Sequence, residues 1–196
     1  MMVILDNGHG HTTPGKRSPV WTDGTQLFEW EFARDVVKRI HKGLQRLSIE
    51  SVILVPEAAD VRLTTRVNRA NQINADHSGS FFISVHGNAG GGQGWEVFLY
   101  TDKTESKALA QMMFNSAVKH LPEFRMRKGA YTDYKFGDFT VLKGTNCPAI
   151  LTENLFYDNE KECKFMLSDE GHERIAKLHV EGILNFIAYN YEKDYF

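Results

Sequence analysis

Residues 3–17 read VILDNGHGHTTPGKR, and this stretch decides how the rest of the chain is interpreted. The apolar run Val3–Leu5 is typical of a buried strand, and it leads into a glycine-rich turn that carries His9 and His11. A strand followed by such a turn suits either a phosphate-binding loop or a metal-binding turn. The residues around the turn distinguish the two interpretations.

The phosphate-binding interpretation fails on three physical requirements. Gly10, Gly15 and Lys16 match the pattern G-x-x-x-x-G-K, but Arg17 stands where a serine or threonine is needed to ligate magnesium. The following residues, SPVWTDG, cannot begin a helix, so no helix N-terminus would face the anion. Pro14 also removes one amide donor from the loop. We therefore predict a metal-binding turn.

Along the whole chain, apolar segments of strand length alternate with segments whose apolar residues recur at helical spacing. Thr25 is the predicted N-cap of the first helix, and residues 125–143 show neither pattern. This alternation predicts an α/β fold in a single domain, residues 1–196, with a central, mostly parallel, twisted sheet and helices on both faces. The predicted strands are residues 3–5, 51–55, 80–85, 95–100 and 148–151, and the predicted helices are residues 26–47, 64–75, 106–121 and 172–189.

Composition narrows the possible partners. The net charge of -2 and the pI near 6.4 argue against a nucleic-acid partner. No apolar run reaches the length of a membrane span, and the N-terminal residues MMVILDNG lack the features of a signal peptide. Two cysteines, Cys147 and Cys163, are expected to be free thiols. We also expect a monomer.

Polar residues that suit metal chemistry stand at the ends of three predicted strands. His9, His86 and Glu153 each follow an apolar run, and the carboxyl ends of strands are where α/β sheets place their sites. Glu29 lies in the first turn of the first predicted helix. Two imidazoles and one carboxylate form a ligand set of catalytic zinc. The joint placement therefore predicts that His9, Glu29 and His86 bind Zn²⁺ and that Glu153 is the general acid and base.

The same residues resemble a known family. The blocks ILDNGHG, EWEFARDVVKRI, ADHSGSFFISVHGNA and CPAILTENLFYDN are similar to blocks of the zinc-dependent N-acetylmuramoyl-L-alanine amidases of bacterial cell-wall hydrolases and phage endolysins. The resemblance implies an α/β fold, one zinc ion, and cleavage of the amide between N-acetylmuramic acid and L-alanine in peptidoglycan. It implies the same roles for His9, Glu29, His86 and Glu153. His11 departs from the family pattern, and we expect its side chain to be exposed.

Several alternatives stay open at this point. Arg127, next to Lys128, is a candidate for binding a carboxylate of the peptide substrate, although a solvated pair of charges is the simpler interpretation. A zinc peptidase or deacetylase on a related fold, or a wall-binding module without catalysis, are alternative functions. Without a signal peptide, the protein would reach the cell wall either as a lysin released from the cytoplasm or as an exported protein whose signal is missing here.

Overall fold

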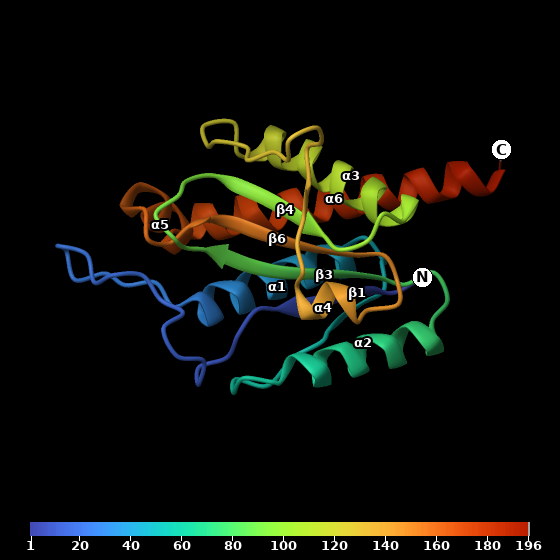
Figure 1. Cartoon of the computed structure of the whole chain (residues 1–196), viewed down its shortest axis with the longest axis horizontal. Helices are drawn as coiled ribbons and strands as arrows, with labels where there is room; N and C mark the ends of the chain where they lie inside the picture. Colours follow the sequence, from blue (N-terminus) through green and yellow to red (C-terminus); the bar gives the residue numbers. More distant parts are fainter. Residues whose placement is uncertain (196) are drawn as a thin grey trace.

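In the computed structural model, which describes residues 1–195, a six-stranded sheet lies between two layers of helices (Figure 1). The strands are β1 (Val3–Asn7), β2 (Ser51–Ile53), β3 (Phe81–Asn88), β4 (Trp95–Leu99), β5 (Lys135–Phe136) and β6 (Ala149–Phe156). The helices are α1 (Glu29–Arg46), α2 (Leu63–Asp76), α3 (Thr104–His120), α4 (Thr140–Lys143), α5 (Glu160–Leu167) and α6 (Asp169–Tyr195).

The strands are arranged in the order β2-β1-β3-β6-β4-β5, and most neighbouring pairs are parallel. β1 pairs in parallel with β2 and β3, and β3 pairs in parallel with β6. β4 runs antiparallel to β6 because the short glycine-rich connection at residues 89–94 turns the chain back after β3. The predicted mostly parallel sheet is therefore confirmed, and its carboxyl-end edge collects residues from β1, β3 and β6.

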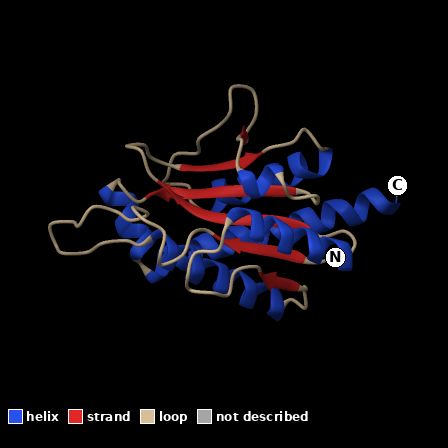
Figure 2. Ribbon diagram, turned by 60° about the horizontal axis from the view of Figure 1, so that its bottom comes forward, coloured by secondary structure: helices blue, strands red, loops and turns tan. Residues whose placement is uncertain are grey.

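Helices cover both faces of the sheet, as predicted (Figure 2). Alternate residues of β3 belong to two separate cores, one on each face of the sheet. Phe81, Ile83 and Val85 pack with α1, α3 and α6 in the larger core. Phe82 points to the other face and packs with residues of α2 and α4 in a smaller core. Both faces of the central strands are buried, which explains why these strands are continuous apolar runs in the sequence.

The first helix begins later than predicted, and Thr25 is not its N-cap. Phe28, in an extended conformation and without a side-chain hydrogen bond, precedes α1. Residues before it are held as an extended ribbon, since Arg17 and Phe28 form an antiparallel bridge and the Leu27 N–H donates to Ser18 Oγ at 2.9 Å. These contacts keep residues 26–28 out of the helix. Glu29 is consequently the first residue of α1.

Two central strands extend beyond their predicted apolar cores. β6 continues past Leu151 to Phe156, and β3 continues to Asn88. His86 and Glu153 therefore lie inside strands, because main-chain pairing between β3 and β6 continues through polar residues. The predicted strand boundaries at these two positions were wrong, although both residues still lie near the carboxyl-end edge.

Two further expectations can be compared with the structure. Cys147 and Cys163 are both buried and are not bonded to each other, as predicted for free thiols. Within residues 1–195, no helix has the length and apolar character needed to cross a membrane.

Candidate metal centre

A cleft of about 750 Å³ opens at the carboxyl ends of β1, β3 and β6. Four residues predicted from the sequence line it: His9, Glu29, His86 and Glu153. They come from the turn after β1, the start of α1, β3 and β6 respectively. The fold therefore brings together residues that are up to 144 positions apart in the chain (153 − 9).

The turn after β1 is shaped to bring His9 against His86. The His9 backbone has φ 61°, in the left-handed region that few non-glycine residues adopt. Its carbonyl accepts hydrogen bonds from Arg34 Nη1 at 3.0 Å and from Arg66 Nη2 at 3.1 Å, which hold this conformation. A Cβ atom on Gly8 would lie 2.4 Å from His86 Cε1, so only glycine permits the approach of the turn to this ring.

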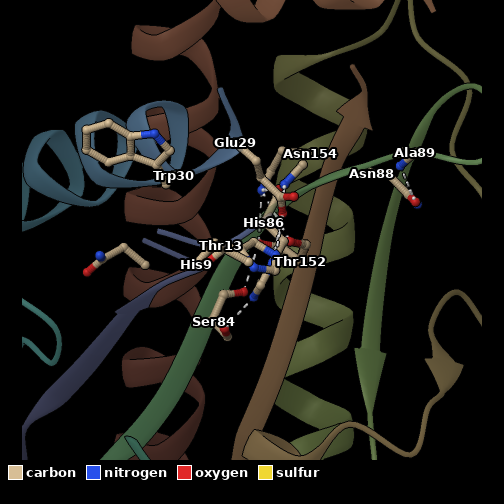
Figure 3. Close-up of polar contacts among 12 residues, drawn as sticks. His9, Thr13, Glu29, Trp30, Ser84, His86, Asn88, Ala89, Thr152 and Asn154 are labelled. Carbon is tan, nitrogen blue, oxygen red and sulfur yellow. Dashed lines mark hydrogen bonds and ion pairs between the residues drawn. The ribbon is translucent and has the colours of Figure 1, made fainter. Parts of the chain in front are cut away.

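Three potential ligand atoms converge in the cleft (Figure 3). Glu29 Oε1 lies 3.2 Å from His9 Nε2 and 3.0 Å from His86 Nδ1. All three ligand atoms lie within 4.8 Å of one another. Ligand atoms about 2.0–2.1 Å from a common tetrahedral zinc ion would be about 3.4 Å apart, so the spacing suits a single ion.

The charges of these groups also suit a metal cation. Burial alone would raise the pKa of Glu29, but the hydrogen bonds to His86 and His9 lower its pKa to about 2. Burial would likewise lower the pKa of His86, yet the Glu29 carboxylate raises it. Glu29 is 1% exposed, and its Oε2 has no hydrogen-bond partner among the described residues. An ionised, buried carboxylate with an unused oxygen between two imidazoles fits a divalent cation.

Glu153 lies beside this group as a second buried carboxyl. It is the register partner of His86 across the β3–β6 pair, so both side chains point to the same face of the sheet. Burial raises the pKa of Glu153 to about 8, with further contributions from the carboxylates of Glu29 and Glu96. Its Oε2 is buried and has no hydrogen-bond partner in residues 1–195. This carboxyl is therefore free to exchange a proton with a bound molecule.

The structure does not bring Arg127 into this cleft. Arg127 Nε donates to Glu96 Oε2 at 2.8 Å, and Lys135 Nζ also bonds this oxygen. Glu96 is in turn the register partner of Glu153 on β4, and it accepts a hydrogen bond from Asn88 Nδ2 at 2.6 Å. Glu96 thus stands between Arg127 and Glu153. Arg127 is not among the residues that line the cleft.

Sequence reasoning missed three residues that contact His9 or His86 directly or through one another: Asp6, Ser84 and Arg66. Asp6 and Ser84 are polar residues within the apolar runs VILDN and FFISV, and they point to the same face of the sheet as His86. A buried polar side chain inside such a run is the signal that could have found them. Arg66 on α2 has no comparable signal in the sequence. His11 is exposed, as predicted, with its ring 6.0 Å from that of Trp30.

The sequence matches the N-acetylmuramoyl-L-alanine amidase family over residues 3–185. The chain belongs to this family. The match confirms the predicted family, the predicted amidase function and the enzyme class, a hydrolase. His9, Glu29 and His86, the three ligands predicted from the sequence, lie where they could together hold a metal ion.

Individual relatives support the assignment. The amidase is 31% identical to an endolysin of Bacillus phage SPP1, over 95% of this chain and 66% of the endolysin. It is 28% identical to the sporulation-specific N-acetylmuramoyl-L-alanine amidase of Bacillus subtilis (strain 168), over 97% of this chain and 69% of that protein. The chain therefore spans about two thirds of the length of these relatives.

A solved structure has the same fold. The crystal structure of N-acetylmuramoyl-L-alanine amidase from Clostridium difficile 630 superimposes on the amidase with a TM-score of 0.80 and 25% sequence identity. The superposition covers 95% of this chain and 96% of that one. The α/β fold is therefore shared along nearly the whole length of both proteins.

Proposed function

We propose that residues 1–196 form one catalytic domain that binds a single zinc ion through His9, Glu29 and His86. The domain hydrolyses the amide between N-acetylmuramic acid and L-alanine in peptidoglycan, and its site of action is the cell wall. The observation that carries the proposal is the convergence of His9 Nε2, Glu29 Oε1 and His86 Nδ1 beside the buried carboxyl of Glu153. When bound, zinc would polarise the scissile carbonyl and lower the pKa of a coordinated water molecule.

Glu153 is the acid and base of the proposed reaction. A group that first accepts a proton from water and then donates it to the leaving amine works best with a pKa near the working pH. The raised pKa of Glu153, about 8, lies close to neutral pH. A cation held by the neighbouring ligands would lower that pKa and favour the carboxylate, which is the form that accepts the proton.

The buried surroundings of Glu153 serve the same purpose. Its Oε2 has no protein partner within residues 1–195, so a proton on this carboxyl has no competing acceptor there. Glu29 is excluded from the acid–base role, since its pKa of about 2 keeps it ionised as a ligand. The two carboxyl groups therefore have different roles, Glu29 as a ligand and Glu153 as the acid and base, because their surroundings move their pKa values in opposite directions.

Arg127 is retained in the proposal as a contact for a carboxylate of the stem peptide. Its Nε is committed to Glu96, but neither Nη atom has a hydrogen bond to the described residues. The guanidinium carbon lies 5.0 Å from the centre of the Phe156 ring, within the range of a cation–π contact. A planar group with two free donors can bind a carboxylate through both of its oxygens.

The proposal is tested by incubating the purified protein with bare peptidoglycan and measuring newly freed L-alanine amino groups. We expect release that stops when a chelator removes the metal and returns when zinc is added. A sample that holds zinc but frees no L-alanine amino groups would overturn the proposed substrate bond, while leaving the metal site intact.

A further inference from the structure

A chain of buried hydrogen bonds runs behind His86, on the side of the ring away from Glu29. Arg66 Nη1 donates to Asp6 Oδ1 at 2.7 Å, and Ser84 Oγ donates to Asp6 Oδ2 at 2.6 Å. Ser84 Oγ lies 3.1 Å from His86 Nε2, a contact drawn in Figure 3. Arg66, Asp6 and Ser84 are each at most 2% exposed, so the side chains of this chain of hydrogen bonds are buried.

The direction of every hydrogen bond in this chain is determined. The Arg66 guanidinium can only donate, so Asp6, its ion-pair partner, accepts on Oδ1. Asp6 also accepts on Oδ2, which uses the single proton of the Ser84 hydroxyl. With its proton committed to Asp6, Ser84 can only accept a hydrogen bond from the imidazole. His86 must therefore donate from Nε2.

We propose that the chain Arg66–Asp6–Ser84 holds the ring proton of His86 on Nε2 and so makes Nδ1 the metal-binding atom. This inference rests on the proposed metal site. His86 Nδ1 lies 3.0 Å from Glu29 Oε1, a position that either a proton or a cation can occupy. A neutral ring has only one proton, and a ring that keeps this proton on Nε2 has its Nδ1 lone pair free for the metal.

Arg66 is the anchor of this arrangement and also holds the second histidine ligand. Its five N–H donors are all used: the acceptors are the carbonyls of Val61, Asn7 and His9 and the carboxylates of Asp6 and Asp60. One buried side chain thus fixes the strained backbone of His9 through a direct bond and the ring of His86 through Asp6 and Ser84. It is a positioning residue for both imidazoles.

Two variants test the chain from different ends. Ser84→Ala removes the acceptor for His86 Nε2–H, and support of this kind is worth about 10- to 100-fold in metal affinity. In Asp6→Asn, the side-chain amide oxygen of the new asparagine faces Arg66, because Arg66 can only donate hydrogen bonds. The side-chain amide nitrogen then faces Ser84 and donates a hydrogen bond to its hydroxyl. Ser84 then donates to His86 Nε2, and the ring proton moves to Nδ1, where it competes with the metal. We expect this nearly isosteric change to weaken zinc binding at least as much as Ser84→Ala.

The matched control is Ser116→Ala. Ser116 is also a buried serine, 1% exposed, whose hydroxyl donates one hydrogen bond, to the Leu178 carbonyl at 2.7 Å. It lies on α3, on the opposite face of the sheet from the cleft. We expect Ser116→Ala to keep the zinc affinity of the wild type. Thermal unfolding of the zinc-free variants, followed by circular dichroism, establishes that each one is folded.

The experiment measures zinc affinity by competition with a chromophoric chelator, and the protonated nitrogen of His86 by ¹⁵N–¹H correlation spectroscopy. We expect Nε2 of the wild-type ring to be protonated with and without zinc, and Nε2 of zinc-free Asp6→Asn to be unprotonated. A wild-type ring with an unprotonated Nε2, or folded Ser84→Ala and Asp6→Asn with wild-type affinity, would overturn the inference. A wild type that binds no zinc would instead overturn the proposed function, and the protonated nitrogen would still be read in the zinc-free protein.

Discussion

Glu153 on β6 lies directly beside His86 on β3, as its partner in the parallel register of the two central strands. Side chains of register partners point to the same face of a sheet, so the fold itself sets the position of the proposed acid–base group relative to a proposed metal ligand. The same β6 residue is paired with Glu96 on β4.

Zinc should stabilise the folded protein through Glu29. A ligand that binds only the folded state at 100 times its dissociation constant adds about 2.7 kcal/mol to the free energy of unfolding. Glu29→Gln removes the ionised ligand and should abolish this gain, which chemical denaturation with and without zinc measures. Glu31→Gln is the control, because Glu31 lies in the same helical turn but is exposed. Zinc stabilisation that persists in Glu29→Gln would contradict the assigned ligand set.

Gly8→Ala should destroy zinc binding without any change to a ligand. The new Cβ would lie 2.4 Å from His86 Cε1, so the ring must move away from Glu29. Gly24→Ala is the comparison, since Gly24 has φ 80° but its Cβ would meet nothing within 4 Å. That variant should lose about 1–2 kcal/mol of stability and keep its zinc affinity in a chelator competition. Equal zinc affinity in the two variants would rule out the close packing of Gly8 as the cause.

His179 should make the protein sensitive to acid. Its Nδ1–H donates to the Ile175 carbonyl at 2.7 Å and its Nε2 accepts from the Thr152 hydroxyl at 2.9 Å. Burial lowers the pKa of His179 from 6.5 to about 4. Between these pH values the unfolded chain binds a proton that the folded protein does not, so stability is fully present above pH 6.5 and falls as the pH drops towards 4.

The measurement for His179 is the free energy of unfolding of the wild type and of His179→Gln at several pH values. The advantage of the wild type over the variant should shrink by about 3 kcal/mol between pH 7 and pH 4. A constant difference across this range would show that His179 does not remain neutral in the folded protein.

Arg127→Met should weaken substrate binding more than it slows the chemical step. Loss of a contact made equally in the bound and transition states raises KM and leaves kcat nearly unchanged. We expect a KM about tenfold higher for a muropeptide that carries its stem carboxylate. Lys128→Met is the control, because Lys128 is paired with Asp133 at 2.7 Å. An unchanged KM in Arg127→Met would limit Arg127 to its role as a partner of Glu96.

The amino-acid sequence predicts the four residues of the cleft well, for a simple geometric reason. Parallel strands end at the same edge of a sheet, and His9, His86 and Glu153 converge there because β1, β3 and β6 are neighbours. The start of α1 could not be located in the same way. Its beginning at Glu29 depends on the bridge between Arg17 and Phe28, a contact that no local sequence preference encodes.

The supporting network lies further from what a sequence can reveal. Arg66 reaches Asp6 only because α2 packs on β1 with one particular rotation about its axis, and spacing along the chain does not fix that rotation. The short elements β5 and α4 were missed for a related reason. Each is too short to show a period, and each is held by tertiary contacts with β4 and α2.

The most direct test of the account measures metal content and amidase activity on the same samples of wild type, Glu153→Gln and Glu29→Gln. The wild type should bind one zinc ion and free L-alanine amino groups from peptidoglycan. Glu153→Gln should bind zinc as tightly and lose about 10²- to 10⁴-fold in turnover, while Glu29→Gln should lose both zinc and activity. Turnover near the wild-type rate in zinc-loaded Glu153→Gln would contradict the central claim.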